Sequence, residues 1–333
     1  MTDLIDRSAT PGPLTVAKAQ RRNIIMRFNL LFIFIALFVV ASVSAPQFLT
    51  SQNMANLLQQ SSLTGIVAIG MTVVILTSGI DLSVGSVAAL SGMLVAIFIG
   101  AGIPWPVAMA LAIGAGLVLG GVMGGLSAYL ALPAFMVTLA GMQSIRGLTY
   151  LTTNGTPTTA EIPMGLRFLG AGSIAGIPVV GVIFVLTTVI VGLVLRRTTF
   201  GEHLYAVGSN PQAARLSGLP VQRIATAAYV ISGGLAALTG VLLTARLTIG
   251  QPTANTGLEL DAIAAVVLGG TSLFGGKGGV MGTFIAVLLL SVLRNLFNLL
   301  GLSSFFQMLV TGLILIAALI MNYLLDRQSK SAA

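Results

Sequence analysis

Long apolar stretches, separated by short polar segments, run along most of this 333-residue chain. A helix needs about 20 mainly apolar residues to cross a bilayer. The alternation of apolar and polar positions that is typical of membrane strands is absent from the sequence. The pattern therefore predicts an all-α polytopic membrane protein with about ten transmembrane helices. The predicted spans are 28–45, 54–77, 87–101, 107–130, 133–153, 179–195, 222–247, 257–272, 280–300 and 303–325.

Composition agrees with this interpretation and excludes several classes of site. Hydrophobic residues make up 56% of the chain and charged residues 7%, whereas soluble domains carry about 25% charged residues. The chain has no cysteine and one histidine, His203. A thiol nucleophile and a Cys-based or His-rich metal site are therefore excluded, and we expect no metal site.

Basic residues indicate how the chain is oriented. Cytoplasmic loops of membrane proteins are enriched in Lys and Arg, so we assign the formal net charge of +8 to orientation rather than to a nucleic-acid partner. Both termini are then predicted to be cytoplasmic. The predicted parts are a flexible N-terminus (1–25), a transmembrane domain (26–325) and a short tail (326–333). The basic residues that fall outside or near the outer ends are Arg146, Arg167, Arg246 and Arg294.

The longest polar segment with helix potential is 196–221, RRTTFGEHLYAVGSNPQAARLSGLPV, between two predicted spans. Asn210 suits an N-cap and Pro211 suits the first helical turn. Residues 212–217 would form the body of a short helix, and Gly218 would end it. The basic flanks indicate the cytoplasmic side. From the residues alone, the segment is either a solvated connector or a docking helix for a cytoplasmic partner.

Glycines recur at a spacing of four in the fourth predicted span, at Gly116, Gly120 and Gly124. Small residues at this spacing let another helix approach closely. We therefore assign these glycines to helix packing.

Two short segments resemble one another. Residues 78–82, SGIDL, and 256–260, TGLEL, both have a hydroxyl residue followed three positions later by a carboxylate. This spacing predicts capping boxes formed by Ser78 with Asp81 and by Thr256 with Glu259. In the predicted topology the two segments open helices that run in opposite directions, which is the relation that a five-plus-five inverted repeat produces.

Charged residues within spans are functional candidates because burying them is costly. Asp81 is the acidic residue most expected at membrane depth, either as a helix cap or as part of a transport path. Glu259 and Asp261 are similar candidates, with Arg246 as a partner for them. The segment 273–279, LFGGKGG, lacks the pattern of a nucleotide-binding Walker A loop, because Thr271 and Gly278 stand where glycine and Ser/Thr are needed. It is predicted to be a tight inner turn.

Three segments together resemble the ribose-type sugar ABC-importer permeases. They are TSGIDLSVGS (77–86), GSNPQAARLSGL (208–219) and ELDAIAAVVLGGTSLFGGKG (259–278), in this order. The resemblance extends from about Pro46 to the C-terminus. It implies a non-enzymatic permease subunit in a bacterial inner membrane, working as a homodimer. A separate cytoplasmic ATPase would bind ATP and Mg, and a periplasmic or lipid-anchored binding protein would deliver the sugar.

The resemblance also implies roles for residues. The segment 208–219 is similar to the family's coupling loop, whose short helix docks on the ATPase, with Arg215 as the main charged contact. The residues assigned to ATPase coupling are Glu202, Asn210, Pro211, Ala214, Arg215, Leu216 and Gly218. Because sugars need amide and hydroxyl partners, the residues proposed for the translocation path or gate are Gln59, Gln60, Asp81, Asn295 and Asn298.

Other functions remain open at this point. A permease of the same superfamily for nucleosides or branched-chain amino acids would share much of the pattern. A stand-alone secondary transporter or channel would leave the docking-like helix unexplained. An intramembrane enzyme has little support, since no Ser/His/Asp cluster or carboxylate pair emerges from the sequence.

Overall fold

The structure is a computed structural model that describes residues 30–331. The predicted flexible N-terminus lies outside the described residues. The described chain is almost entirely helical. Its helices are an unlabelled N-terminal helix (Leu30–Ser44), α2 (Ser51–Leu76), α3 (Val84–Gly100), α4 (Trp105–Tyr129), α5 (Ala134–Leu151), α6 (Met164–Ala171), α7 (Val179–Arg197), α8 (Thr199–Ser209), α9 (Pro211–Leu216), α10 (Val221–Leu247), α11 (Leu258–Leu268), α12 (Val280–Leu299) and α13 (Ser304–Ser331).

Within the described chain, five helices are long and apolar enough to cross a membrane: α2, α4, α7, α10 and α12. Leu30–Ser44, α3 and the Ser304–Ile314 part of α13 are shorter apolar helices. Many large apolar side chains on the outside of these helices are exposed. A polytopic membrane protein accounts for both observations, because lipid rather than water would cover those side chains.

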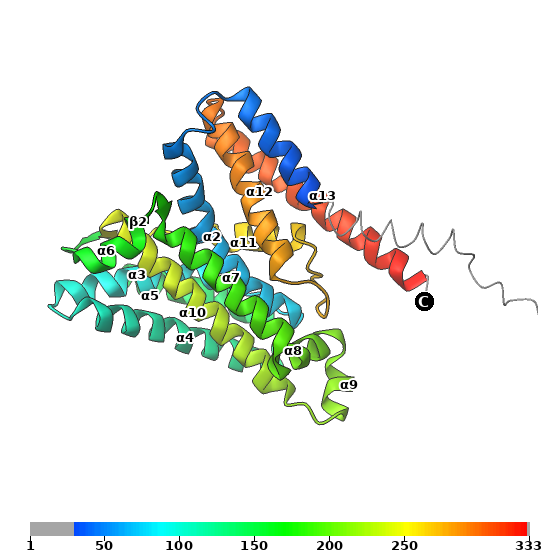
Figure 1. The fold of residues 1–333 in the computed structure, drawn as a ribbon. Helices are drawn as coiled ribbons and strands as arrows, with labels where there is room; N and C mark the ends of the chain where they lie inside the picture. Colours follow the sequence, from blue (N-terminus) through cyan, green and yellow to red (C-terminus); the bar gives the residue numbers. More distant parts are fainter. Residues whose placement is uncertain (1–29, 332–333) are drawn as a thin grey trace, which may run out of the picture.

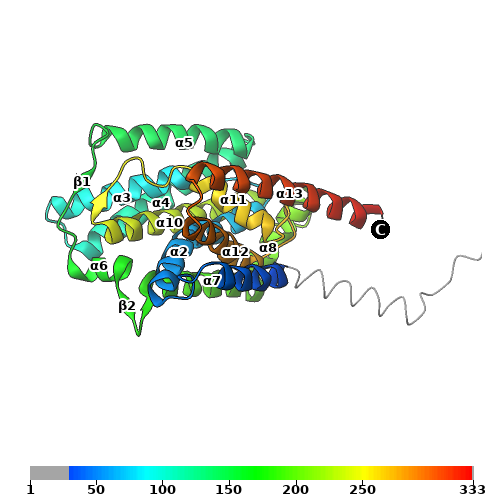
Figure 2. The ribbon, with the colours of Figure 1, turned by 90° about the horizontal axis from the view of Figure 1, so that it is seen from above.

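Two helices form the centre of the molecule. Between Ser61 and Leu76, α2 is buried on nearly every side, which is expected of a helix that is apolar all round. α2 packs against α7, α10, α11 and α12, while α10 packs against α2, α3 and α4. Seen from above, α5 lies on one side of the molecule and α7 on the other, with α2 and α10 between them (Figure 2).

The glycine spacing in α4 serves helix packing, as predicted. Gly116, Gly120 and Gly124 all face α10. A Cβ added at Gly120 would lie 2.2 Å from the carbonyl oxygen of Tyr229, and one added at Gly116 would lie 2.6 Å from that of Gly233. Without side chains at these positions, the two backbones approach closely enough for continuous contact along the α4–α10 interface.

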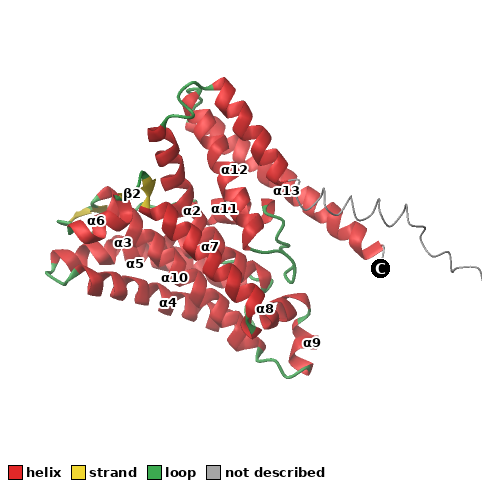
Figure 3. Cartoon of the chain, viewed as in Figure 1, coloured by secondary structure: helices red, strands yellow, loops and turns green. Residues whose placement is uncertain are grey.

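Short strands and short helices lie at the two ends of the long helices. The short strands are β1 (Thr158–Thr159), which pairs with β4 (Ile249–Gly250), and β2 (Ser173–Ile174), which pairs with β3 (Ile177–Pro178). Figure 1 shows β2 and the short helix α6 at one end of the long helices, and α8 and α9 at the opposite end. The strands stand out against the helices in Figure 3. Residues 154–178 lie between two predicted spans, and the sequence pattern did not predict α6 or the strands β1 to β3 that they form.

Candidate functional site

The predicted short helix on the polar loop is confirmed as α9, Pro211–Leu216. The Oδ1 atom of Asn210 accepts hydrogen bonds from the backbone N–H groups of Gln212 (3.1 Å) and Ala213 (3.0 Å). Pro211 occupies the first turn. The helix ends at Leu216, and Gly218, two residues further on, turns the chain with a φ of 82° that is readily adopted only by glycine. Each end of α9 is therefore fixed by local sequence chemistry.

A second helix, α8, precedes α9 and was not predicted. Thr198 caps it, accepting a hydrogen bond from the N–H of Gly201 at 3.4 Å. Leu204 and Val207 are buried on its inner side, and Glu202 is exposed in its first turn. The apolar positions Phe200, Leu204 and Val207 have helical spacing, so the periodicity of the sequence contained this signal.

The outer side of α9 is unusual for its combination of exposed groups. Ala214 is buried and attaches the helix to the rest of the protein, whereas Arg215 is exposed and Leu216 is 90% exposed. An apolar side chain presented so fully beside a cation, on a helix with fixed ends, suits a contact with another protein. Of the seven residues assigned to coupling, Ala214 is buried and the other six are exposed.

Three segments that are distant in the sequence meet at a place that we call the motif junction. They are Leu76–Ser78 at the end of α2, Gly208–Ser209 at the end of α8, and Leu273–Gly279 before α12. The Ser78 hydroxyl donates to the carbonyl oxygens of Phe274 (2.7 Å) and Gly208 (3.2 Å). The N–H of Gly276 donates to the carbonyl oxygen of Leu76 at 3.0 Å. All three segments that carry the family resemblance therefore meet here.

The motif junction is packed backbone against backbone. A Cβ on Gly208 would lie 1.8 Å from the carbonyl oxygen of Leu76. The Leu273–Gly279 segment forms the predicted tight turn, with positive φ at Gly275, Gly276 and Gly278. The Tyr205 hydroxyl on α8 donates to the carbonyl oxygen of Gly278 at 2.9 Å. Burial raises the pKa of the Tyr205 phenol.

The first predicted capping box is wrong. α3 begins at Val84 with Ser83 at the N-cap position, and Ser78 lies upstream with a φ of 64°. The Ser78 hydroxyl is used at the motif junction instead. Asp81 is buried, as expected, and it accepts from the Ser83 N–H (3.0 Å), the Ser83 hydroxyl (2.6 Å) and the Ser232 hydroxyl on α10 (2.9 Å). Asp81 therefore joins the start of α3 to α10.

The second capping box is also wrong. α11 begins at Leu258 with Gly257 as its N-cap, and the Thr256 hydroxyl donates to the carbonyl oxygen of Thr253 at 2.9 Å. Glu259 is buried in the first turn of α11. Within the described part of the chain, its Oε2 atom has no hydrogen-bond partner.

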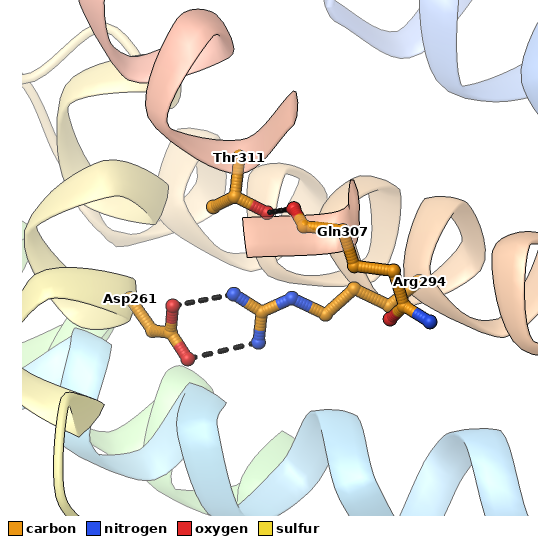
Figure 4. Close-up of polar contacts among 4 residues, drawn as sticks. All are labelled: Asp261, Arg294, Gln307 and Thr311. Carbon is orange, nitrogen blue, oxygen red and sulfur yellow. Dashed lines mark hydrogen bonds and ion pairs between the residues drawn. The ribbon is translucent and has the colours of Figure 1, made fainter. Parts of the chain in front are cut away.

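The expectation that Arg246 pairs with the acidic residues of α11 is wrong for Asp261. Asp261 forms a two-bond ion pair with Arg294 on α12: Arg294 Nη1 lies 2.8 Å from Oδ2, and Nη2 contacts Oδ1 (Figure 4). The neighbouring Thr311 hydroxyl donates to the Gln307 carbonyl oxygen within α13. Arg146 on α5 donates from Nη1 to the carbonyl oxygens of Pro252 and Ala254, each at 2.8 Å.

The amide residues proposed for the translocation path have different environments. Asn295 on α12 exchanges two hydrogen bonds with Asn53 on α2, at 2.8 and 2.9 Å. Asn298 accepts from Gln307 on α13 at 2.8 Å. Gln59 is half-buried and Gln60 is exposed on α2. The two asparagines thus join helices to one another in this structure, and a role for any of the four in the path stays a prediction.

Comparison with known proteins identifies the family. Residues 53–319 match the family described as "Branched-chain amino acid transport system / permease component". The chain belongs to this family of transport permeases. Permease chains of this kind are the non-catalytic membrane component of an ABC transporter. No solved structure matches the chain.

Among curated relatives, three illustrate the range of similarity. The ribose import permease protein RbsC of Escherichia coli K12 is 42% identical over 305 residues, which cover 90% of this chain and 94% of that protein. RbsC of Bacillus subtilis is 46% identical over 297 residues, covering 89% and 91%. The L-arabinose ABC transporter permease protein AraH of Azospirillum brasilense is 36% identical, with 94% of each chain covered.

Proposed function

We propose that this chain is the membrane permease of a bacterial ABC importer that carries a ribose-like monosaccharide across the inner membrane. The observation that carries this proposal is the 42–46% identity to ribose import permeases over about nine tenths of the chain. The family description names branched-chain amino acids, so a permease for these or for nucleosides is the alternative within the family. The relatives matched over nearly their full length favour a pentose or a related hexose.

The proposed topology has ten spans arranged as two inverted halves, with both termini in the cytoplasm. One half is Leu30–Ser44 with α2 to α5, and the other is α7 with α10 to α13. The packing supports this division, because α10 contacts α3 and α4 of the first half while α2 contacts α11 and α12 of the second. A two-fold relation between the halves would exchange these two sets of contacts.

In this mechanism the chain supplies a path and a contact surface, while the chemistry occurs elsewhere. A cytoplasmic ATPase, with ATP and Mg at its own site, would bind α9 of each permease in a homodimer. A binding protein on the outer side would deliver the sugar. Closure of the ATPase would push α9, and the sugar would pass between the two permease copies.

The motif junction offers a route for that push. α9 follows directly from Asn210 and Ser209, and the adjacent Gly208 touches the end of α2 through Leu76 and Ser78. Asp81, three residues further on, is bonded to Ser232 in the middle of α10. A displacement of α9 would therefore reach the two central helices through short, direct contacts.

The test is association with the ABC ATPase encoded beside this chain. We expect a permease with Arg215→Glu and Leu216→Ser to retain about a tenth or less of the wild-type ATPase affinity in a detergent pull-down, since the exposed cation and the most exposed apolar side chain of α9 are removed. Arg167→Glu is the matched control, because it makes the same charge change on exposed α6 at the opposite end of the helices. Folding is checked by monodispersity in size-exclusion chromatography.

Two results would contradict the proposal. Unchanged ATPase binding by the folded α9 variant would remove the docking role of this helix. Folded wild-type protein that binds no ATPase, yet transports in vesicles, would favour the stand-alone transporter.

A further inference from the structure

The inner turn Leu273–Gly279 presents a second exposed apolar side chain on the same end of the molecule as α9. Phe274 is 72% exposed, although it belongs to a turn rather than to an outward face of a membrane helix. Lys277 in the same turn is also exposed. The backbone of this turn is well anchored: the carbonyl oxygen of Phe274 accepts from Ser78, and the N–H of Gly276 donates to Leu76.

The turn lies against the C-terminal end of α8, from which α9 follows directly. A Cβ on Gly276 would lie 2.2 Å from the hydroxyl oxygen of Ser209, which directly precedes the α9 cap Asn210. Tyr205 on α8 holds the other side of the turn through Gly278. Figure 1 shows the turn before α12 beside the α8–α9 corner. Phe274 and Leu216 are therefore exposed apolar groups on two neighbouring, fixed elements.

We propose that the Leu273–Gly279 turn is a second docking element for the ATPase, with Phe274 inserted in an apolar pocket of that protein next to the groove that receives α9. This inference rests on the proposed function. A partner that covers α9 and extends along the end of α8 also reaches the turn, because Ser209, the residue before the α9 cap, lies directly against Gly276. An aromatic side chain on an anchored backbone has few rotatable bonds to order on binding, and such residues carry much of the affinity of interfaces.

Charge indicates the chemistry of the partner surface. Near α9 and the turn, one acidic residue, Glu202, is exposed among several exposed basic ones. The basic residues are Arg196, Arg197, Arg215, Arg223 and Lys277. The ATPase surface that fits is an apolar pocket with a mainly acidic rim.

The direct experiment is site-specific photo-crosslinking in membranes that contain the assembled transporter. A benzophenone derivative of phenylalanine replaces Phe274, Leu216 or, as the control at the outer end, Met164, which is 82% exposed. We expect crosslinks to the ATPase from positions 274 and 216 and none from 164. In parallel, Phe274→Ser should weaken ATPase binding by about tenfold, with Met164→Ser at wild-type affinity.

The outcomes separate the inference from the proposed function. Position 216 reaching the ATPase while position 274 reaches only lipid or a second permease copy would overturn the second docking element and leave α9 docking intact. A complex in which neither position reaches the ATPase would overturn both. Wild-type affinity of the folded Phe274→Ser variant would show that the side chain adds nothing to docking.

Discussion

The α4–α10 interface makes a quantitative prediction about a single methyl group. Gly120→Ala adds a Cβ that would lie 2.2 Å from the Tyr229 carbonyl oxygen and 3.2 Å from the Gly233 Cα. Ordinary van der Waals contact begins near 3.4 Å, so the helices must separate locally by about 1 Å. A gap of that size forfeits about a quarter to a half of the attraction between facing atoms. We therefore expect a loss of about 1–3 kcal/mol in stability.

Gly125→Ala is the matched control on the same helix. A Cβ at Gly125 meets nothing within 4 Å, so the added methyl costs no contact. In a helix, Ala is favoured over Gly by about 1 kcal/mol. The control should therefore be as stable as the wild type or slightly more stable.

The assay is thermal unfolding of the purified permease in detergent, followed by the fluorescence of its single tryptophan, Trp105. Trp105 is the first residue of α4, so its emission reports on this helix. The midpoint should fall by on the order of a few degrees for Gly120→Ala and stay constant or rise for Gly125→Ala. Equal midpoints for Gly120→Ala and the wild type would refute the close approach of these two backbones.

Three further predictions concern the α9 cap, the motif junction and the Arg294–Asp261 ion pair. Asn210→Ala should remove the α9 cap, worth about 1 kcal/mol, and weaken ATPase binding. Asn210→Asp should retain the cap and the binding. Equal ATPase binding by the two variants would contradict this prediction. Gly208→Ala should leave ATPase binding intact but lower sugar uptake. Its Cβ would lie 1.8 Å from the Leu76 carbonyl oxygen and would push the segments of the motif junction apart. Normal sugar uptake by this variant would contradict the role of the motif junction. Arg294→Gln should lower the unfolding midpoint by an amount that corresponds to about 1 kcal/mol, because solvent screens the ion pair. The Arg294 and Asp261 side chains are 34% and 30% exposed. A double-mutant cycle with Asp261→Asn that gives no coupling energy would contradict this prediction.

The parts of this molecule that local chemistry determines were predictable. α9 could be predicted residue by residue, because its cap, its first-turn proline and its terminal glycine all act within a few residues. The long apolar helices followed from hydropathy for the same reason. The glycine spacing in α4 predicted a close helix contact, but the sequence could not say that α10 supplies the other surface.

The parts that depend on tertiary contacts were not predictable. Ser78 has the spacing of a helix cap, yet its hydroxyl bonds to Phe274, 196 positions away, so a distant carbonyl outcompetes the local amide. Asp261 and Arg294 lie 33 positions apart, and nothing in the sequence distinguishes Arg294 from Arg246 as the partner. Asn295 is a polar residue within a predicted span. The structure supplies the reason, because its side-chain amide pairs with that of Asn53.

The motif junction explains why three short sequence segments can be distinctive without any catalytic residue. Each supplies backbone groups or glycines that must lie within hydrogen-bonding distance of the other two, and side chains larger than those present would separate them. Close-packed contacts of this kind have low compressibility and transmit displacement. In the proposed mechanism, a flexible connection between α9 and α2 would absorb a push from the ATPase. The hydrogen bond from Ser78 to the Gly208 carbonyl oxygen and the backbone contact of Gly208 with Leu76 would instead pass it on. Under the proposed function, the junction is the part of the chain where tight backbone packing and energy coupling would require the same residues.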